Sequence, residues 1–161
     1  MMIKILFVCL GNICRSTMCQ SVFTYLVKQA GREGEFYIES AATSREEIGN
    51  GPHYGTVNKL RQEGIPVVPH RAVQMTGADY DKYDYLIGMD DANIRNMARI
   101  CGGDPAGKFY KLLDFEGIEQ KETAVRRGMA RSVADPWYTD DFDATYRDVI
   151  AGCTGLLNYL S

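Results

Sequence analysis

A nearly continuous apolar run, Ile3–Cys9, consists mainly of β-favouring residues and lacks the alternation of a half-buried strand. A strand of this kind is usually covered on both faces, as in a parallel sheet. Shorter runs follow at residues 36–41 and 85–89, and a weaker one at 109–113. Helix-period segments separate these runs. The chain therefore predicts an α/β fold, with a four-stranded parallel sheet flanked by helices on both faces.

The predicted helices are defined by apolar spacing and by residues that start or stop a helix. They cover residues 16–30, 53–63, 91–100 and 146–160. Asp90 is well placed to cap the third helix, and we expect Asp90 and Asp91 to act only as capping residues. Residues 102–135 are rich in glycine and charge, which predicts a long surface loop around the weak fourth strand.

Size and composition limit the classes of protein to consider. The 161 residues fit one domain, residues 1–161, with enough chain to bury a core. Hydrophobic residues make up 45% and charged residues 24%, which is typical of a soluble globular protein. The net charge of −3 gives no reason to expect a nucleic acid or a membrane as a partner. No apolar stretch reaches the ~18 residues of a membrane span.

The cysteines predict free thiols. Five cysteines cannot pair completely, and neither they nor His53 and His70 show the spacing of metal ligands. We therefore expect no metal and no cofactor. The apolar run near the N-terminus lacks the basic flank and the small-residue cleavage site of a secretory signal. Together these features predict a cytoplasmic protein with reduced thiols.

The segment that follows the first strand, residues 9–16, predicts a phosphate-binding loop. Ligands of parallel α/β sheets bind at the carboxyl ends of the strands, where Cys9, Ser40 and Asp90 fall. Backbone N–H groups of a loop that leads into a helix, together with the helix dipole, favour an anion and also a cysteine thiolate. Arg15 adds a planar fork that matches two phosphate oxygens.

Other residues of the loop fit the same chemistry. Gly11 and Asn12 can adopt positive φ angles, and Ser16 can donate its hydroxyl group to the Cys9 sulfur. A simpler interpretation is that Cys9 is an inert buried thiol at a strand end. The context of a strand, a Gly-Asn pair and a helix favours the reactive cysteine.

Residues 9–16, Cys-Leu-Gly-Asn-Ile-Cys-Arg-Ser, strongly resemble the signature of the low molecular weight protein tyrosine phosphatases. The resemblance continues in the same order at residues 40–44, 47–50, 70–72, 85–87, 89–90 and 135–138. It covers nearly the whole chain. It implies a Rossmannoid fold with a four-stranded parallel sheet, and hydrolysis of phosphotyrosine.

The resemblance also implies residue roles. Cys9 is the nucleophile that forms a phosphocysteine, Arg15 binds the phosphate and Asp135 is the general acid. The residues expected to line the substrate site are Leu10, Gly11, Asn12, Ile13, Cys14, Ser16, Glu46, Trp137 and Tyr138. A hydrogen-bond network is expected among Asn12, Ser16, Ser40 and His70. The expected partners are phosphotyrosine-containing proteins or peptides, with inorganic phosphate or vanadate as active-site anions.

General chemistry agrees with the role of Asp135. A tyrosine leaves as a phenolate and benefits from a proton delivered by a carboxylic acid on a separate loop. Pro136 biases Asp135 away from helical geometry. Without the loop at residues 9–16, Asp135 would be interpreted as a turn residue before a proline.

The sequence departs from the family pattern at several positions. The family usually follows Arg-Ser with proline, a hydrophobic residue, alanine and glutamate. Here Thr17 replaces the proline, which softens the helix start, and Gln20 removes a negative charge near the loop. Glu46 stands where many relatives have an aromatic wall. Together with Asp140 and Asp141, which we expect at the same rim, Glu46 predicts a preference for basic peptides.

Cys14 allows two interpretations. It is close enough in sequence to Cys9 for a disulfide, which would make it a redox-resolving cysteine. Alternatively, it is a small residue that packs under the loop.

Three other functions are compatible with parts of the sequence. Arsenate reductases share the loop, but they need further cysteines after the third strand, and here only Cys101 lies beyond it. Protein-arginine phosphatases tend to have a small polar residue where this chain has Ile13, and a bulky residue there favours an aryl phosphate. A phosphotyrosine-binding module without activity would lack Cys9 or Asp135, and both are present.

Overall fold

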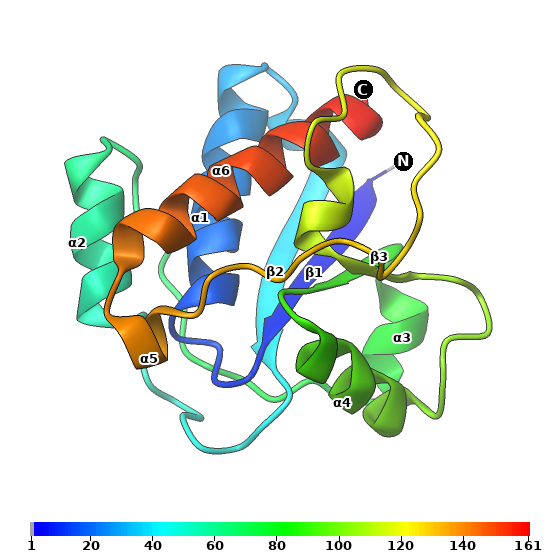
Figure 1. Cartoon of the computed structure of the whole chain (residues 1–161), viewed down its shortest axis with the longest axis horizontal. Coiled ribbons are helices and arrows are strands. Elements are labelled where there is room, and N and C mark those ends of the chain that lie inside the picture. The colour runs from blue at the N-terminus through cyan, green and yellow to red at the C-terminus, as the bar shows by residue number, and fades with distance from the viewer. Residues whose placement is uncertain (1) are drawn as a thin grey trace.

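The computed structural model describes residues 2–161, and its centre is a parallel sheet with the strand order β2-β1-β3-β4 (Figure 1). The strands are β1 (Ile3–Cys9), β2 (Phe36–Ala42), β3 (Tyr85–Gly88) and β4 (Phe109–Lys111). Every neighbouring pair runs parallel. The predicted four-stranded parallel sheet is confirmed.

Helices cover both faces of the sheet, as predicted (Figure 1). They are α1 (Arg15–Gln29), α2 (Tyr54–Gln62), α3 (Ala78–Lys82), α4 (Asp91–Cys101), α5 (Pro136–Thr139) and α6 (Phe142–Tyr159), with short 3-10 turns η1 (Glu33–Glu35) and η2 (Leu112–Phe115). The α1 and α6 helices pack together on one face, and α3 and α4 lie on the other. None of these helices, over residues 2–161, is long and apolar enough to span a bilayer.

The apolar run of β1 is explained by this layering. Ile5 and Phe7 belong to the core shared with α1 and α6, whereas Leu6 and Val8 belong to the core shared with α3 and α4. All four side chains are buried. Because successive side chains of a strand point to opposite faces, a strand between two cores needs apolar residues at every position. This arrangement fixes Cys9 at the carboxyl end of the central strand pair.

Some element boundaries differ from the prediction. The fourth strand ends at Lys111, because Leu112 turns into η2 and packs against α6 at Gly152, where a Cβ atom would clash with it. The last helix begins earlier than its apolar spacing indicates, at Phe142, because the Asp141 carboxylate caps it by accepting the Ala144 N–H at 3.0 Å. The short helices α3 and α5 were not predicted, since neither is long enough to show helical periodicity.

Candidate active site

Four carbonyl groups of the segment between β1 and α1 bind donors from the surrounding chain. Donors from Thr43, Ser44, His53 and Thr56 bind the carbonyl oxygens of Cys9, Leu10, Ile13 and Cys14 at 2.9, 3.0, 2.7 and 3.1 Å. In a trans peptide group the N–H points opposite to the C=O. The N–H groups of these four peptide groups therefore face inward. The Asn12 N–H also faces inward and lies 3.3 Å from the Cys9 sulfur. This geometry forms an anion-binding cradle.

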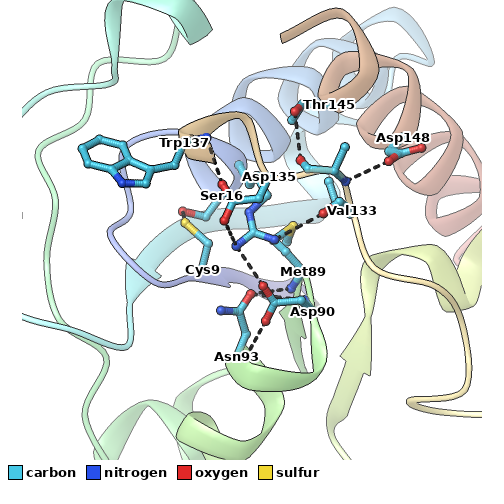
Figure 2. Close-up of polar contacts among 12 residues, drawn as sticks. Cys9, Ser16, Met89, Asp90, Asn93, Val133, Asp135, Trp137, Thr145 and Asp148 are labelled. Carbon is cyan, nitrogen blue, oxygen red and sulfur yellow. Dashed lines mark hydrogen bonds and ion pairs between the residues drawn. The ribbon is translucent and has the colours of Figure 1, made fainter. Parts of the chain in front are cut away.

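Cys9 lies at the base of this cradle. Its sulfur is 3.1 Å from the Ser16 hydroxyl oxygen, as predicted from the sequence (Figure 2). The Ser16 oxygen accepts the Asn12 side-chain amide at 2.8 Å, so its own hydrogen is available to the sulfur. Asn12 adopts a positive φ of 59°, the backbone conformation expected at this position. The Ser16 hydroxyl and the Asn12 N–H are thus both placed to donate to the Cys9 sulfur.

The predicted network around Asn12 is present. The His70 Nε2 atom lies 2.7 Å from the Asn12 Oδ1 atom and 3.3 Å from the Ser40 hydroxyl oxygen. Burial lowers the pKa of His70 below its usual value, although the nearby Glu39 carboxylate acts in the opposite direction. His70 is therefore a neutral group that supports the loop at neutral pH.

Arg15 is the cation of the site. It is 3% exposed, its Nη1 donates to the Val133 carbonyl at 3.3 Å, and its Nη2 lies 2.9 Å from Asp90 and 3.4 Å from Asp135 (Figure 2). Burial lowers the pKa of the guanidinium, but nearby negative charges, of which Cys9 and Asp135 contribute most, raise it above its usual value. Arg15 therefore stays charged despite its burial, and its orientation is fixed.

The expectation that Asp90 only caps a helix is wrong. The Asp90 carboxylate does cap α4, since its Oδ1 atom accepts the Asn93 N–H at 2.7 Å. Its other oxygen, however, forms the shorter of the two ion pairs with Arg15. Asp91 also does more than begin the helix, because it pairs with Lys111 at 2.9 Å. Asp90 thus links the start of α4 to the orientation of the guanidinium.

Asp135 is held opposite the loop by contacts on its N-terminal side. The Val133 N–H donates to the Met89 carbonyl at 2.9 Å, and the Ala134 N–H donates to the Asp148 carboxylate at 2.9 Å (Figure 2). These bonds attach the segment to the end of β3 and to α6. The Asp135 Oδ1 atom then caps α5 by accepting the Trp137 N–H at 3.1 Å. The carboxylate therefore faces Arg15 from a well-defined position.

A cavity of about 200 Å³ lies between the loop that joins β1 to α1 and the segment that carries Asp135. Its lining residues are Cys9, Leu10, Gly11, Ile13, Cys14, Arg15, Glu46, Glu47, Asp135, Trp137 and Tyr138. Trp137 and Tyr138 are 60% and 82% exposed and form an aromatic rim. Residues 2–161 contain no group of three or more His, Cys, Asp or Glu side chains arranged to hold a metal ion.

The comparisons with known proteins agree along the whole chain. Residues 4–161 match the family model "Low molecular weight phosphotyrosine protein phosphatase". The low molecular weight protein-tyrosine-phosphatase YfkJ of Bacillus subtilis is 38% identical over 97% of this chain and 94% of its own length. The chain belongs to the low molecular weight protein tyrosine phosphatase family.

Other members of this phosphatase family extend the comparison. The low molecular weight phosphotyrosine protein phosphatase of Saccharomyces cerevisiae is 34% identical over 91% of this chain and 88% of its own length. The crystal structure of YfkJ superposes with a TM-score of 0.86 over 98% of this chain and 93% of that one. The phosphatase from Streptococcus pyogenes, 37% identical, gives 0.82 over 99% and 94%. The structural matches therefore agree with the family assignment that the sequence matches show.

Within the phosphatase fold, most of the residues expected at the substrate site do line the cavity. Asn12 and Ser16 instead lie behind it and support Cys9. Asp140 and Asp141 are not at the rim. They line a neighbouring groove between α2 and the start of α6, and Glu47 takes the place beside Glu46.

One residue beside the phosphatase site, His53, has contacts that its sequence context did not predict. His53 binds the Ile13 carbonyl through its backbone N–H, and its ring stacks on Phe142 with a centroid distance of 5.3 Å. The same ring meets Trp137 edge-on at 6.3 Å. His53 therefore connects the phosphate loop to the Asp135 segment. A histidine at a helix N-cap gives no local signal of such a role.

In this phosphatase the structure shows the contacts of Thr17, which departs from the family pattern, and the environment of Cys14, which allowed two interpretations. The Thr17 hydroxyl donates to the Ile13 carbonyl at 2.9 Å and lies 3.1 Å from that of Cys14, contacts that a proline could not make. Cys14 is buried, and burial, followed by the negative charges of Cys9 and Asp135, raises the pKa of its thiol to about 12. Cys14 is therefore a protonated thiol in the resting site.

Proposed function

We propose that this phosphatase hydrolyses phosphotyrosine in proteins or peptides through a phosphocysteine on Cys9, with Asp135 as general acid and then general base. The observation that supports this proposal is the position of Cys9 at the base of an anion cradle, with Arg15 beside it and Asp135 held opposite. These are the three groups that a covalent phosphoryl transfer requires.

In the first step the Cys9 thiolate attacks phosphorus, and the bond between phosphorus and the phenolic oxygen breaks. Asp135 gives its proton to that oxygen, so that tyrosine leaves as a neutral phenol. The Arg15 fork and the inward N–H groups stabilise the charge on the equatorial oxygens. The phosphate also replaces Asp135 as a partner of Arg15, which frees the carboxyl group to act as an acid.

In the second step water attacks the phosphocysteine. The Asp135 carboxylate takes a proton from this water, the phosphorus–sulfur bond breaks, and Cys9 leaves as the thiolate. Inorganic phosphate is released, and Asp135 is again protonated. Both steps use the same groups, and no metal or cofactor takes part.

The walls of the cavity support an aryl phosphate. Ile13 and Leu10 are apolar lining residues, and the exposed rings of Trp137 and Tyr138 can stack on the substrate ring. The test is hydrolysis of phosphotyrosine, phosphoserine and phosphoarginine, with arsenate reduction measured alongside. We expect phosphotyrosine to be turned over fastest. Faster release of phosphate from phosphoarginine, or reduction of arsenate, would replace the proposal by the corresponding alternative.

The acidic rim predicts which phosphotyrosine peptides are preferred. Glu46 and Glu47 both line the cavity, so a basic residue beside the phosphotyrosine would meet two carboxylates. Each exposed charge pair is worth roughly 0.2–1 kcal/mol, so two pairs would favour Lys-flanked over Glu-flanked peptides by about two- to thirty-fold in kcat/KM at low salt.

The measurement is kcat/KM for matched Lys- and Glu-flanked peptides at low and high ionic strength. Salt should reduce the preference. Glu46→Trp should reduce it and also lower the KM of small aryl phosphates by restoring an apolar wall. Glu119→Gln, a change outside the cavity lining, should leave it intact. A ratio near one at low salt, or one that Glu46→Trp does not alter, would show that Glu46 does not face the peptide.

We also propose that Cys14 resolves oxidised Cys9. Peroxide oxidises the Cys9 thiolate to a sulfenic acid. The Cys14 sulfur then attacks the Cys9 sulfur, a disulfide forms, and the hydroxyl group of the sulfenic acid leaves as water. Oxidation removes the negative charge of Cys9, one of the causes that raise the pKa of Cys14, so Cys14 becomes more nucleophilic at that moment. Burial still opposes its ionisation, and disulfide formation should therefore be faster at higher pH.

Wild-type enzyme inactivated by peroxide should accordingly recover with dithiothreitol. Cys14→Ser should recover far less, because the unprotected sulfenic acid is oxidised further. Cys101→Ser is the control, since this partly exposed thiol does not line the cavity. Equal recovery of wild type and Cys14→Ser would leave Cys14 with a packing role only. A thiolate enzyme with further free thiols needs a reducing compartment, and we propose the cytoplasm.

A further inference from the structure

Gln20 is a buried polar residue of α1 that the proposed mechanism does not use. It is 4% exposed and does not line the cavity. Its Oε1 atom accepts the Ser40 hydroxyl at 2.5 Å. Its Nε2 atom lies 3.4 Å from the Ile38 carbonyl and 3.4 Å from the Glu39 carboxylate, both on β2. The Gln20 side-chain amide thus accepts a hydrogen bond through its oxygen and donates toward oxygen atoms of β2 through its nitrogen.

Hydrogen bonds continue from this amide to the reactive sulfur. The Ser40 oxygen contacts His70 Nε2, which contacts Asn12 Oδ1. The Asn12 amide nitrogen reaches the Ser16 oxygen, and Ser16 reaches the Cys9 sulfur. This relay connects β2 and α1 to the base of the phosphate cradle.

The direction of each bond in the relay follows from groups with fixed roles. The backbone N–H of Val73 donates to Asn12 Oδ1 at 3.2 Å, so this oxygen is an acceptor and His70 Nε2 must carry a hydrogen. The Ile38 carbonyl likewise requires the nitrogen of the Gln20 amide, so the amide oxygen faces Ser40. The Ser40 hydrogen therefore points at Gln20, away from His70.

The direction matters for the loop. If the Ser40 hydroxyl turned and donated to His70 Nε2, that nitrogen would be an acceptor 2.7 Å from the Asn12 oxygen, which is also an acceptor. Two acceptors at this distance repel each other, and the Asn12 oxygen would lose its bond from His70 and keep only the longer one from the Val73 N–H. An acceptor at position 20 prevents this arrangement.

A neutral side chain at position 20 also controls charge. A carboxylate in place of the Gln20 amide would lack the donor that Ile38 needs and would face Glu39 as a like charge. It would also give His70 a counterion through the Ser40 hydroxyl. Glu39 is the charged group that acts to raise the pKa of His70. The two side chains that join the relay from the phosphate loop and from α1 are Asn12 and Gln20, and both are neutral.

We propose that Gln20 is a positioning residue, whose neutral amide fixes the direction of the relay to Cys9 and withholds a counterion from His70. This role matters for catalysis only if Cys9 is the nucleophile, as proposed above. The test uses titration and alkylation, which require no turnover, so a failure of the Gln20 proposal can be told apart from a failure of the phosphatase mechanism.

The test is an NMR titration of the His70 ring in wild type, Gln20→Glu, Ser40→Ala and the double variant, with His53 as an internal reference. Gln20→Glu should raise the pKa of His70 by about one unit or more, as an opposite charge within a few ångströms does. In the Ser40→Ala background the same change should give less than half of that rise, because the connecting hydroxyl is absent. No rise, or an equal rise in both backgrounds, would overturn the proposal.

A second variant covers the case in which Gln20→Glu does not fold. Gln20→Met keeps the size of the side chain and removes its acceptor, so the Ser40 hydroxyl is free to turn. Alkylation of Cys9 by iodoacetamide at pH 6 should then slow by about threefold or more, the factor expected when one hydrogen bond to the sulfur is weakened. Thermal unfolding measured in parallel identifies folded protein. An unchanged alkylation rate in folded Gln20→Met would overturn the proposal.

Discussion

Cys9→Ser should abolish turnover while phosphate still binds. Serine is nearly the same size as cysteine, and it leaves the inward N–H groups and Arg15 in place. Its hydroxyl group is not ionised at neutral pH, and in the first step Asp135 acts as the acid and so cannot accept the hydroxyl proton, which stops attack on phosphorus. Binding can be followed by the fluorescence of Trp137, the single tryptophan of the chain, which lines the cavity. Turnover is measured with an aryl phosphate.

Arg15→Ala provides the contrasting variant. Removing the guanidinium deletes the phosphate clamp and leaves Asp90 without its cation, so both binding and turnover should be lost. A rapid acid quench of the wild-type reaction should trap phosphate on Cys9. Appreciable turnover by Cys9→Ser, or a quench without a phosphocysteine, would exclude the covalent mechanism.

The parts of the site that could be predicted from the sequence are those built by contiguous residues. The strand, the phosphate loop and the start of α1 occupy residues 3–16, and their bonds, such as the one from Ser16 to Cys9, are local. The fold was also predictable, because the uninterrupted apolar character of β1 reflects the two cores that enclose it. Local patterns determine both features.

The parts that could not be predicted depend on contacts between distant segments. Asp90 has the sequence context of a helix cap, and its ion pair with Arg15 exists only because β3 lies beside β1. Gln20 has the sequence context of an ordinary polar residue in a helix, and its role becomes visible only in its contacts with Ser40 and Ile38 of β2. Such roles come from sheet order, which apolar periodicity does not specify.

The misplaced rim carboxylates have a simple backbone explanation. Asp140 adopts a left-handed conformation with φ of 57°, ends α5 and turns the chain away from the cavity. Asp141 then serves as the cap of α6. The prediction assumed that the segment after Asp135 continues along the rim, and a single residue with positive φ is enough to redirect it.

Asp135→Asn should separate substrates by the quality of their leaving groups. The asparagine oxygen can still accept the Trp137 N–H and cap α5, so the segment keeps its position while the transferable proton is lost. Phenyl-type phosphates with poor leaving groups should lose about 10²–10⁴-fold in kcat, the usual contribution of general acid catalysis. Nitrophenyl phosphate should lose much less, because its phenolate leaves without a proton.

A control variant makes this test specific to the carboxyl group at position 135. Asp140→Asn, which changes a carboxylate of the neighbouring groove, should behave like wild type. If Asp135→Asn instead reduced kcat equally across the leaving-group series, the carboxylate would serve to position its loop and the Arg15 guanidinium, and another group or solvent would have to protonate the phenolate.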